Sequence, residues 1–166
     1  NRPFLTDRLY AGSAENMEDF SGRLKALAWR SGMRRAKQVA FLGDGARCLW
    51  KWAEENLPKG SIFIQDFWHV CEHLSKLAQL LFPEKQAEKS FKLWKGWLRK
   101  SKLKKLFKTL RALHTQRRGK SREALGKEIA YLENARARMD YARYEKDGWL
   151  IGSGAIEGTC KHLVKT

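Results

Sequence analysis

Two acidic side chains stand directly after short apolar segments that are typical of buried strands. Asp44 follows residues 38–43, and Asp66 follows residues 61–65. If these strands are parallel neighbours, both carboxylates lie at the edge of the sheet where open α/β folds bind ligands. Carboxylate oxygens suit Mg²⁺, and two such ions about 4 Å apart activate the attacking oxygen and stabilise the leaving oxygen of a phosphodiester. Asp-Gly is also a common turn pair, which accounts for Asp44 without chemistry.

Glu157 is a third candidate carboxylate. It follows the flexible sequence Gly-Ser-Gly at residues 152–154 and stands in the first turn of a helix predicted to start near Ala155. An acidic residue in the first turn suits the helix dipole, which explains Glu157 equally well as a structural residue.

His69, Cys71 and His73 lie close together on a predicted helix, with the two histidines four residues apart on one face. The catalytic zinc pattern His-Glu-x-x-His needs a glutamate where this sequence has Val70. We therefore expect these side chains to pack or to form hydrogen bonds near the end of the second strand, rather than to hold a structural zinc ion.

The segments that carry these residues predict a mixed α/β fold. Strands at 38–43 and 61–65 flank a helix at 46–57, and such a strand–helix–strand unit of under thirty residues pairs its strands in parallel. An earlier helix is capped by Ser13 and ends near Gly32. Helical periodicity then predicts a run of four helices, at 68–82, 84–100, 101–115 and 121–144.

The charge of the chain predicts a polyanionic partner. Its 166 residues include 34 Lys and Arg against 18 Asp and Glu, a net charge of +16. Nucleic acid is the leading partner for such a field, and an anionic membrane surface is the weaker alternative. No apolar run is long enough to span a bilayer, and no secretory leader opens the sequence, so we expect a cytoplasmic protein without a membrane partner.

The positive charge is concentrated between Lys92 and Arg122, a stretch without a single Asp or Glu. Leucines recur through it at helical spacing, so each helix has an apolar face to pack and a basic face to present. The alternative is an ordinary solvated surface. The candidate DNA-binding residues are Lys92, Lys95, Arg99, Lys100, Lys102, Lys104, Lys105, Lys108, Arg111, Arg117 and Arg118.

Three sequence segments together carry a family resemblance. They are residues 41–50 with Gly-Asp44-Gly-Ala, residues 64–74 with Asp66-Phe-Trp-His69, and residues 152–165 with Ala-Ile-Glu157-Gly. In this order and spacing they resemble bacterial insertion-sequence transposases of the DDE group, near the Mutator-like branch. The resemblance extends from about Gly32 to the last residue.

The resemblance implies an RNase H-like catalytic fold and Mg²⁺- or Mn²⁺-dependent cleavage and strand transfer of DNA. Asp44 matches the second catalytic aspartate and Glu157 the third acidic residue, both as metal ligands. Asp66 and His69 match a motif that supports the site. The implied organisation is a partial RNase H-like core at 1–69, a basic helical insertion at 70–149 and a return to the core at 150–166.

The same resemblance implies partners and an incomplete site. DNA, as element ends and target, is the expected partner, and the full-length form is expected to be a homo-oligomer. The family's first aspartate lies on a strand upstream of this sequence, and Asp7 and Asp19 are poor substitutes, so we expect an inactive carboxy-terminal part of a catalytic domain.

Three alternatives stay open. Asp44, Asp66 and Glu157 could form the whole triad by themselves. The chain could also be a non-catalytic, helical nucleic-acid-binding protein, which explains the charge equally well. The last alternative is an inactive remnant of a mobile element.

Overall fold

A strand–helix–strand unit forms the centre of the computed structural model, which describes residues 17–152. Strand β1 (Ala40–Gly43) leads through helix α2 (Arg47–Asn56) to strand β2 (Ile62–Gln65). The strands pair in parallel with Gly43 opposite Gln65, which confirms the predicted pairing. A mixed α/β fold is thereby confirmed. The RNase H-like core stays a prediction, because the sheet has two strands within the described residues.

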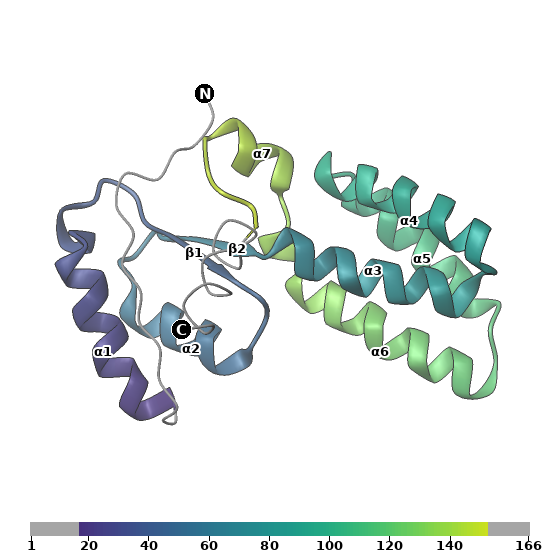
Figure 1. Ribbon diagram of the computed structural model, residues 1–166, viewed down its shortest axis with the longest axis horizontal. Helices are drawn as coiled ribbons and strands as arrows, with labels where there is room; N and C mark the ends of the chain where they lie inside the picture. The colour runs from purple at the N-terminus through teal and green to yellow at the C-terminus, as the bar shows by residue number, and fades with distance from the viewer. Residues whose placement is uncertain (1–16, 153–166) are drawn as a thin grey trace, which may run out of the picture.

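One side of this unit is covered by α1 (Met17–Arg30), which is followed by the short 3₁₀ helix η1 (Met33–Arg35) (Figure 1). The indole nitrogen of Trp52 on α2 donates a 2.8 Å hydrogen bond to the Ser21 hydroxyl on α1. Trp50 and Trp52 are both buried, so α2 packs through its aromatic residues. The predicted cap Ser13 lies outside the described residues.

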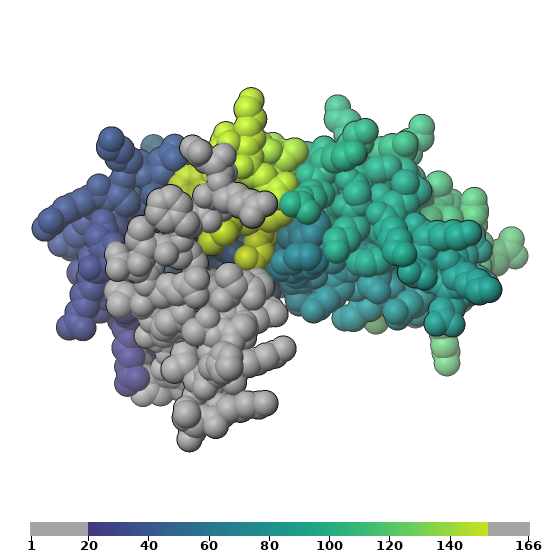
Figure 2. Space-filling model, turned by 45° about the horizontal axis from the view of Figure 1, so that its top comes forward, coloured from purple at the N-terminus to yellow at the C-terminus, as the bar shows by residue number. Residues whose placement is uncertain are grey.

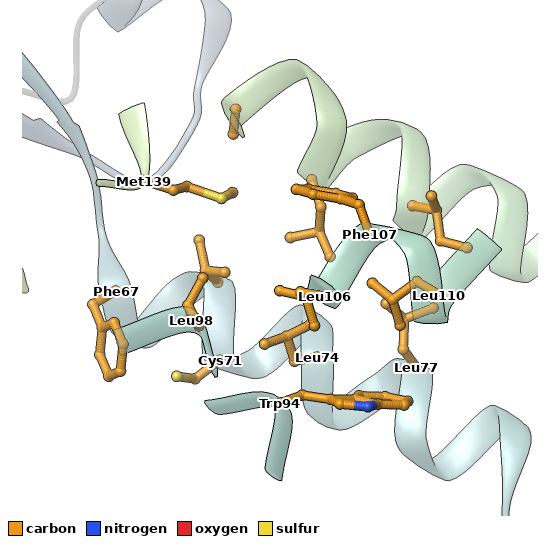
Figure 3. Packing of buried hydrophobic residues seen from close by; sticks show 14 of the residues in the cluster. Phe67, Cys71, Leu74, Leu77, Trp94, Leu98, Leu106, Phe107, Leu110 and Met139 are labelled. Carbon is orange, nitrogen blue, oxygen red and sulfur yellow. The ribbon is translucent and has the colours of Figure 1, made fainter. Parts of the chain in front are cut away.

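Four helices form a second lobe, which we call the helical lobe: α3 (Phe67–Leu81), α4 (Glu84–Arg99), α5 (Leu103–Thr115) and α6 (Gly119–Ala135). Helix α3 continues directly from β2 and so joins the two halves (Figure 1). Its buried face carries Leu74 and Leu77, which lie in one cluster with Trp94 of α4 and Phe107 of α5 (Figure 3). The apolar faces predicted from helical spacing are therefore the ones that pack.

The prediction of one helix over 121–144 is wrong. Helix α6 ends at Ala135, and the chain continues through η2 (Arg136–Arg138) into α7 (Tyr141–Lys146). The break allows two tyrosines to reach β2: the Tyr141 hydroxyl donates to the Gln65 carbonyl at 2.9 Å, and the Tyr144 hydroxyl donates to the Phe63 carbonyl at 3.3 Å. Both tyrosines are buried, so the bend covers one edge of β2.

The helices are too short or too polar to cross a bilayer. Among residues 17–152, no helix has the length and apolar character of a membrane span. The longest of them, α6, has 17 residues and carries charged side chains along its length.

The fold predicts that Tyr141→Phe destabilises the protein. The substitution leaves the buried Gln65 carbonyl without its hydroxyl donor, and an unsatisfied buried acceptor costs about 1–3 kcal/mol. Urea unfolding of the wild type and the variant measures the difference. Tyr144→Phe is the matched comparison and should cost less, because its bond is longer. Wild-type stability of Tyr141→Phe would contradict this account of the α6–α7 bend.

Candidate functional site at the carboxyl edge of the sheet

Asp44 is the first residue beyond β1, and its side chain is exposed. Its Oδ1 accepts a 3.1 Å hydrogen bond from the Ala46 N–H, a local turn contact. Its backbone carbonyl accepts a 2.7 Å bond from the Tyr131 hydroxyl on α6. The Asp-Gly pair therefore forms a turn, as its sequence indicates. The Asp44 carboxylate remains exposed to solvent at the edge of the sheet.

Asp66 is the first residue beyond β2, and it is 4% exposed. Its N–H donates to the Gly43 carbonyl at 2.8 Å, so the two predicted acidic positions do start from the same edge. Its side chain caps the first turn of α3, because Oδ1 accepts hydrogen bonds from the N–H groups of Trp68 at 2.8 Å and His69 at 3.1 Å. Asp66 is thus the N-cap of α3, and its carboxyl oxygen takes up two N–H groups at the first turn of the helix.

The two histidines of α3 form hydrogen bonds at the same edge, as expected from the sequence. His73 Nδ1 pairs with a carboxylate oxygen of Glu128 on α6, and its Nε2 lies 3.3 Å from His69 Nε2. The His73 ring also stacks on Tyr131, with 4.0 Å between centroids and 24° between planes. Cys71 is buried in the core instead, where burial raises the pKa of its thiol to about 11.

Helix α6 supplies two residues that sequence reasoning missed, Glu128 and Tyr131. Tyr131 accepts a 3.2 Å hydrogen bond from Gln65 Nε2, and burial together with the charge of Asp44 raises the pKa of its phenol. Gly45 has φ of +111°, and a Cβ placed there would meet the Tyr131 hydroxyl at 2.3 Å. The sequence around Tyr131 has no motif that marks it, because its role depends on α6 folding back over the β1–α2 loop.

A cavity of about 380 Å³ lies beside this loop, and its wall includes Gly45, Gln65 and Tyr131. It also includes two cations, the exposed Arg47 and the partly buried Arg138. The Arg138 guanidinium lies 4.3 Å from the Trp50 ring centroid and 3.7 Å from Glu54. Positive charge therefore stands next to the Asp44 turn.

The end of the described chain returns to this edge. The Ile151 carbonyl accepts the Phe67 N–H at 2.8 Å, and Gly152 lies so close to the Trp68 indole that a Cβ would approach it to 2.6 Å. Gly152 is five residues before Glu157, which lies outside the described residues.

Carboxylates from other parts of the chain neutralise some of the predicted DNA-binding cations. Three form ion pairs with nitrogen–oxygen distances of 2.6–2.7 Å: Lys92 with Glu88, Arg99 with Glu145, and Arg111 with Glu133. Arg117 donates to the Leu81 carbonyl at 2.7 Å. The ammonium groups of Lys95 and Lys105 each lie 4.6 Å from a tryptophan ring centroid.

Five of the predicted cations are exposed and have neither a carboxylate nor an aromatic-ring partner among residues 17–152: Lys100, Lys102, Lys104, Lys108 and Arg118. We call them the open cations. Lys102 and Lys104 also line a groove of about 860 Å³ at the start of α5, together with Lys105 and Arg136. Figure 2 shows the α4–α5 surface in teal, at the opposite end of the molecule from α1.

The described residues fit a metal ion only in part. Asp44 offers an exposed carboxylate of the kind Mg²⁺ prefers, but no group of three or more His, Cys, Asp or Glu side chains within residues 17–152 is arranged to hold an ion. The other implied ligand, Glu157, is outside that range.

Comparisons of the chain with protein-family models, with curated proteins and with solved structures find no match. The geometry and the sequence motifs therefore carry the functional argument.

The capping role of Asp66 gives a testable expectation for stability. Asp66→Ala removes the acceptor of two N–H groups and should lower the free energy of unfolding by about 1–2 kcal/mol. Asp66→Asn keeps a capping oxygen and should cost less. Denaturant unfolding compares the three proteins. If Asn is as damaging as Ala, capping is not what the side chain contributes.

Proposed function

We propose that this chain is part of a DDE-type transposase that cleaves DNA and transfers the cut strand. The observation that carries the proposal is the exposed carboxylate of Asp44 at the carboxyl end of β1, within the Gly-Asp-Gly-Ala sequence. Parallel α/β sheets bind their ligands at this edge. The resemblance of the three motif segments to insertion-sequence transposases supports the same proposal.

The chemistry of the proposed site needs Mg²⁺ or Mn²⁺, which would stabilise the charge on the attacking and leaving oxygens of the phosphodiester. Asp44 would hold the ion, and Glu157 would be a second ligand. Asp66 would act indirectly, because its carboxylate holds the start of α3 against the sheet. His69, whose N–H also bonds to Asp66, would share this supporting role.

The proposed DNA contact uses the open cations and the groove at the start of α5. An exposed lysine without a carboxylate partner can exchange its counterion shell for a phosphate, whereas Arg99 and Arg111 would first have to leave Glu145 and Glu133. The open cations are therefore the better phosphate contacts among the predicted set. Arg47 and Arg138, which line the cavity beside the Asp44 turn, would contact phosphates of the same DNA strand near Asp44.

The DNA contact is tested with a triple variant, Lys102→Gln, Lys104→Gln and Lys108→Gln. Each lost phosphate contact lowers the log–log slope of affinity against salt by about 0.9, so the slope should fall by about 2–3 and affinity by roughly tenfold or more at low salt. Fluorescence anisotropy with a duplex of random sequence measures both quantities over a salt series.

The matched control changes the same charge in the α/β half, as Arg35→Gln, Lys37→Gln and Lys59→Gln. All three side chains are exposed and have no carboxylate partner among residues 17–152. The log–log slope of affinity against salt for the control should differ from the wild-type slope by no more than about 0.9, the change expected for one phosphate contact. Equal losses in both triple variants would show that net charge alone, and not the α5 surface, attracts DNA.

The catalytic proposal is tested by strand cleavage and strand transfer assays with the full-length gene product and Mg²⁺. Asp44→Asn and Glu157→Gln should each lower the rate by about 10²-fold or more, because each removes a negative ligand from the reacting centre. Asp147→Asn, which changes another exposed carboxylate in the same way, should leave the rate unchanged. Full activity of Asp44→Asn would refute the assignment.

The second candidate function is nucleic-acid binding without catalysis. It is favoured by the open cations and by the groove that Lys102 and Lys104 line, which account for binding of a polyanion without any catalytic residue. Under this alternative the triple lysine variant loses DNA binding as above, while cleavage is absent from the wild type.

A further inference from the structure

The two histidines of α3 are arranged in a way that their packing does not require. Their Nε2 atoms lie 3.3 Å apart, their ring centroids are 4.9 Å apart, and the rings cross at 79°. The centroids are farther apart than the nitrogens, so the two Nε2 edges turn toward each other. Two nitrogen atoms therefore converge on one point, next to the Tyr131 ring that stacks on His73.

Carboxylates face the opposite nitrogen of each ring. His73 Nδ1 contacts Glu128, and His69 Nδ1 lies 3.3 Å from Glu72 Oε2. A carboxylate at Nδ1 favours the tautomer with its proton on Nδ1, which leaves the Nε2 lone pair available as a ligand. Metal-binding histidines commonly have this outer carboxylate, which fixes the tautomer and makes the imidazole more basic.

The spacing of the nitrogens fits a tetrahedral ion. Zinc–nitrogen bonds of about 2.0–2.1 Å that meet at about 109° place the two nitrogens roughly 3.3–3.4 Å apart. The observed separation of 3.3 Å agrees with that value. In separation, the two nitrogens therefore already match a pair of ligands on one tetrahedral ion.

We propose that His69 and His73 bind a transition-metal dication of the Zn²⁺ type through their two Nε2 atoms. Imidazole nitrogen suits zinc and its neighbours in the first transition row, whereas Mg²⁺ prefers oxygen. The site is thus chemically distinct from the carboxylate site proposed at Asp44, and it stands whether or not the chain cleaves DNA.

Two protein nitrogens leave part of the coordination shell open. Cys71 does not complete the shell, because it is buried in the core between α3 and its neighbours. Within residues 17–152 no third His, Cys, Asp or Glu joins the pair, so water or a phosphate oxygen takes the remaining positions. His69 is about one-third exposed and His73 about one-eighth exposed, which leaves a solvent-facing side for such a ligand.

The test is titration of the full chain with Zn²⁺ by calorimetry, with Cys48→Ser as the background because that thiol is exposed. One Zn²⁺ should bind per chain, and excess Mg²⁺ should not displace it. His69→Gln and His73→Gln should each weaken binding at least tenfold, and Glu128→Gln should weaken it about 10–100-fold through loss of the outer carboxylate. His114→Gln on α5 is the matched control and should bind as the background protein does.

A second measurement needs no variant of the pair. In ¹H–¹⁵N spectra of the imidazoles, Zn²⁺ should shift the Nε2 resonances of His69 and His73 and leave those of His114 in place. The proposal is overturned if the background protein binds no Zn²⁺, which would leave a plain N–H···N hydrogen bond between the rings. It is also overturned if the folded double variant His69→Gln, His73→Gln keeps full affinity.

Discussion

Backbone carbonyls in and just beyond a two-stranded sheet need hydrogen-bond donors, and tyrosine hydroxyls supply three of them here. Tyr131 of α6 bonds to the Asp44 carbonyl, while Tyr141 and Tyr144 of α7 bond to carbonyls of β2. Because buried carbonyls are costly without a donor, the Tyr141 and Tyr144 bonds favour the bend that ends α6, and the Tyr131 bond ties α6 to the β1–α2 loop. The helical lobe is consequently held against the same edge of the sheet that carries the candidate site.

This attachment joins the acidic edge to a strongly basic surface. The carbonyl that Tyr131 holds belongs to Asp44, whose carboxylate faces solvent, and the same helix brings Glu128 to His73. The open cations lie on and beside α4 and α5, the surface that Figure 2 shows at the end of the molecule opposite α1. The cavity wall beside the Asp44 turn includes Arg47 and Arg138, so positive charge also lies close to this edge of the sheet.

Two different coordination chemistries meet at one edge of the sheet. Asp44 presents an exposed carboxylate oxygen, whereas His69 and His73 present imidazole nitrogens beside Tyr131, and His73 also contacts Glu128. Hard ions favour the first set and borderline ions the second. Asp66 lies between these sets in the sequence, and its use as the cap of α3 fixes the direction in which the histidines leave the sheet.

The sequence by itself determined the parallel strand–helix–strand unit, the apolar faces of α3, α4 and α5, and the exposed turn at Asp44, because periodicity and turn chemistry act over a few residues. The RNase H-like core and the transposase identity stay predictions. Tertiary structure alone decided the break after α6, the neutralisation of Arg99 and Arg111, and the meeting of His73 with Glu128. Those features join residues 22 to 81 positions apart, and no local pattern encodes a partner at that distance.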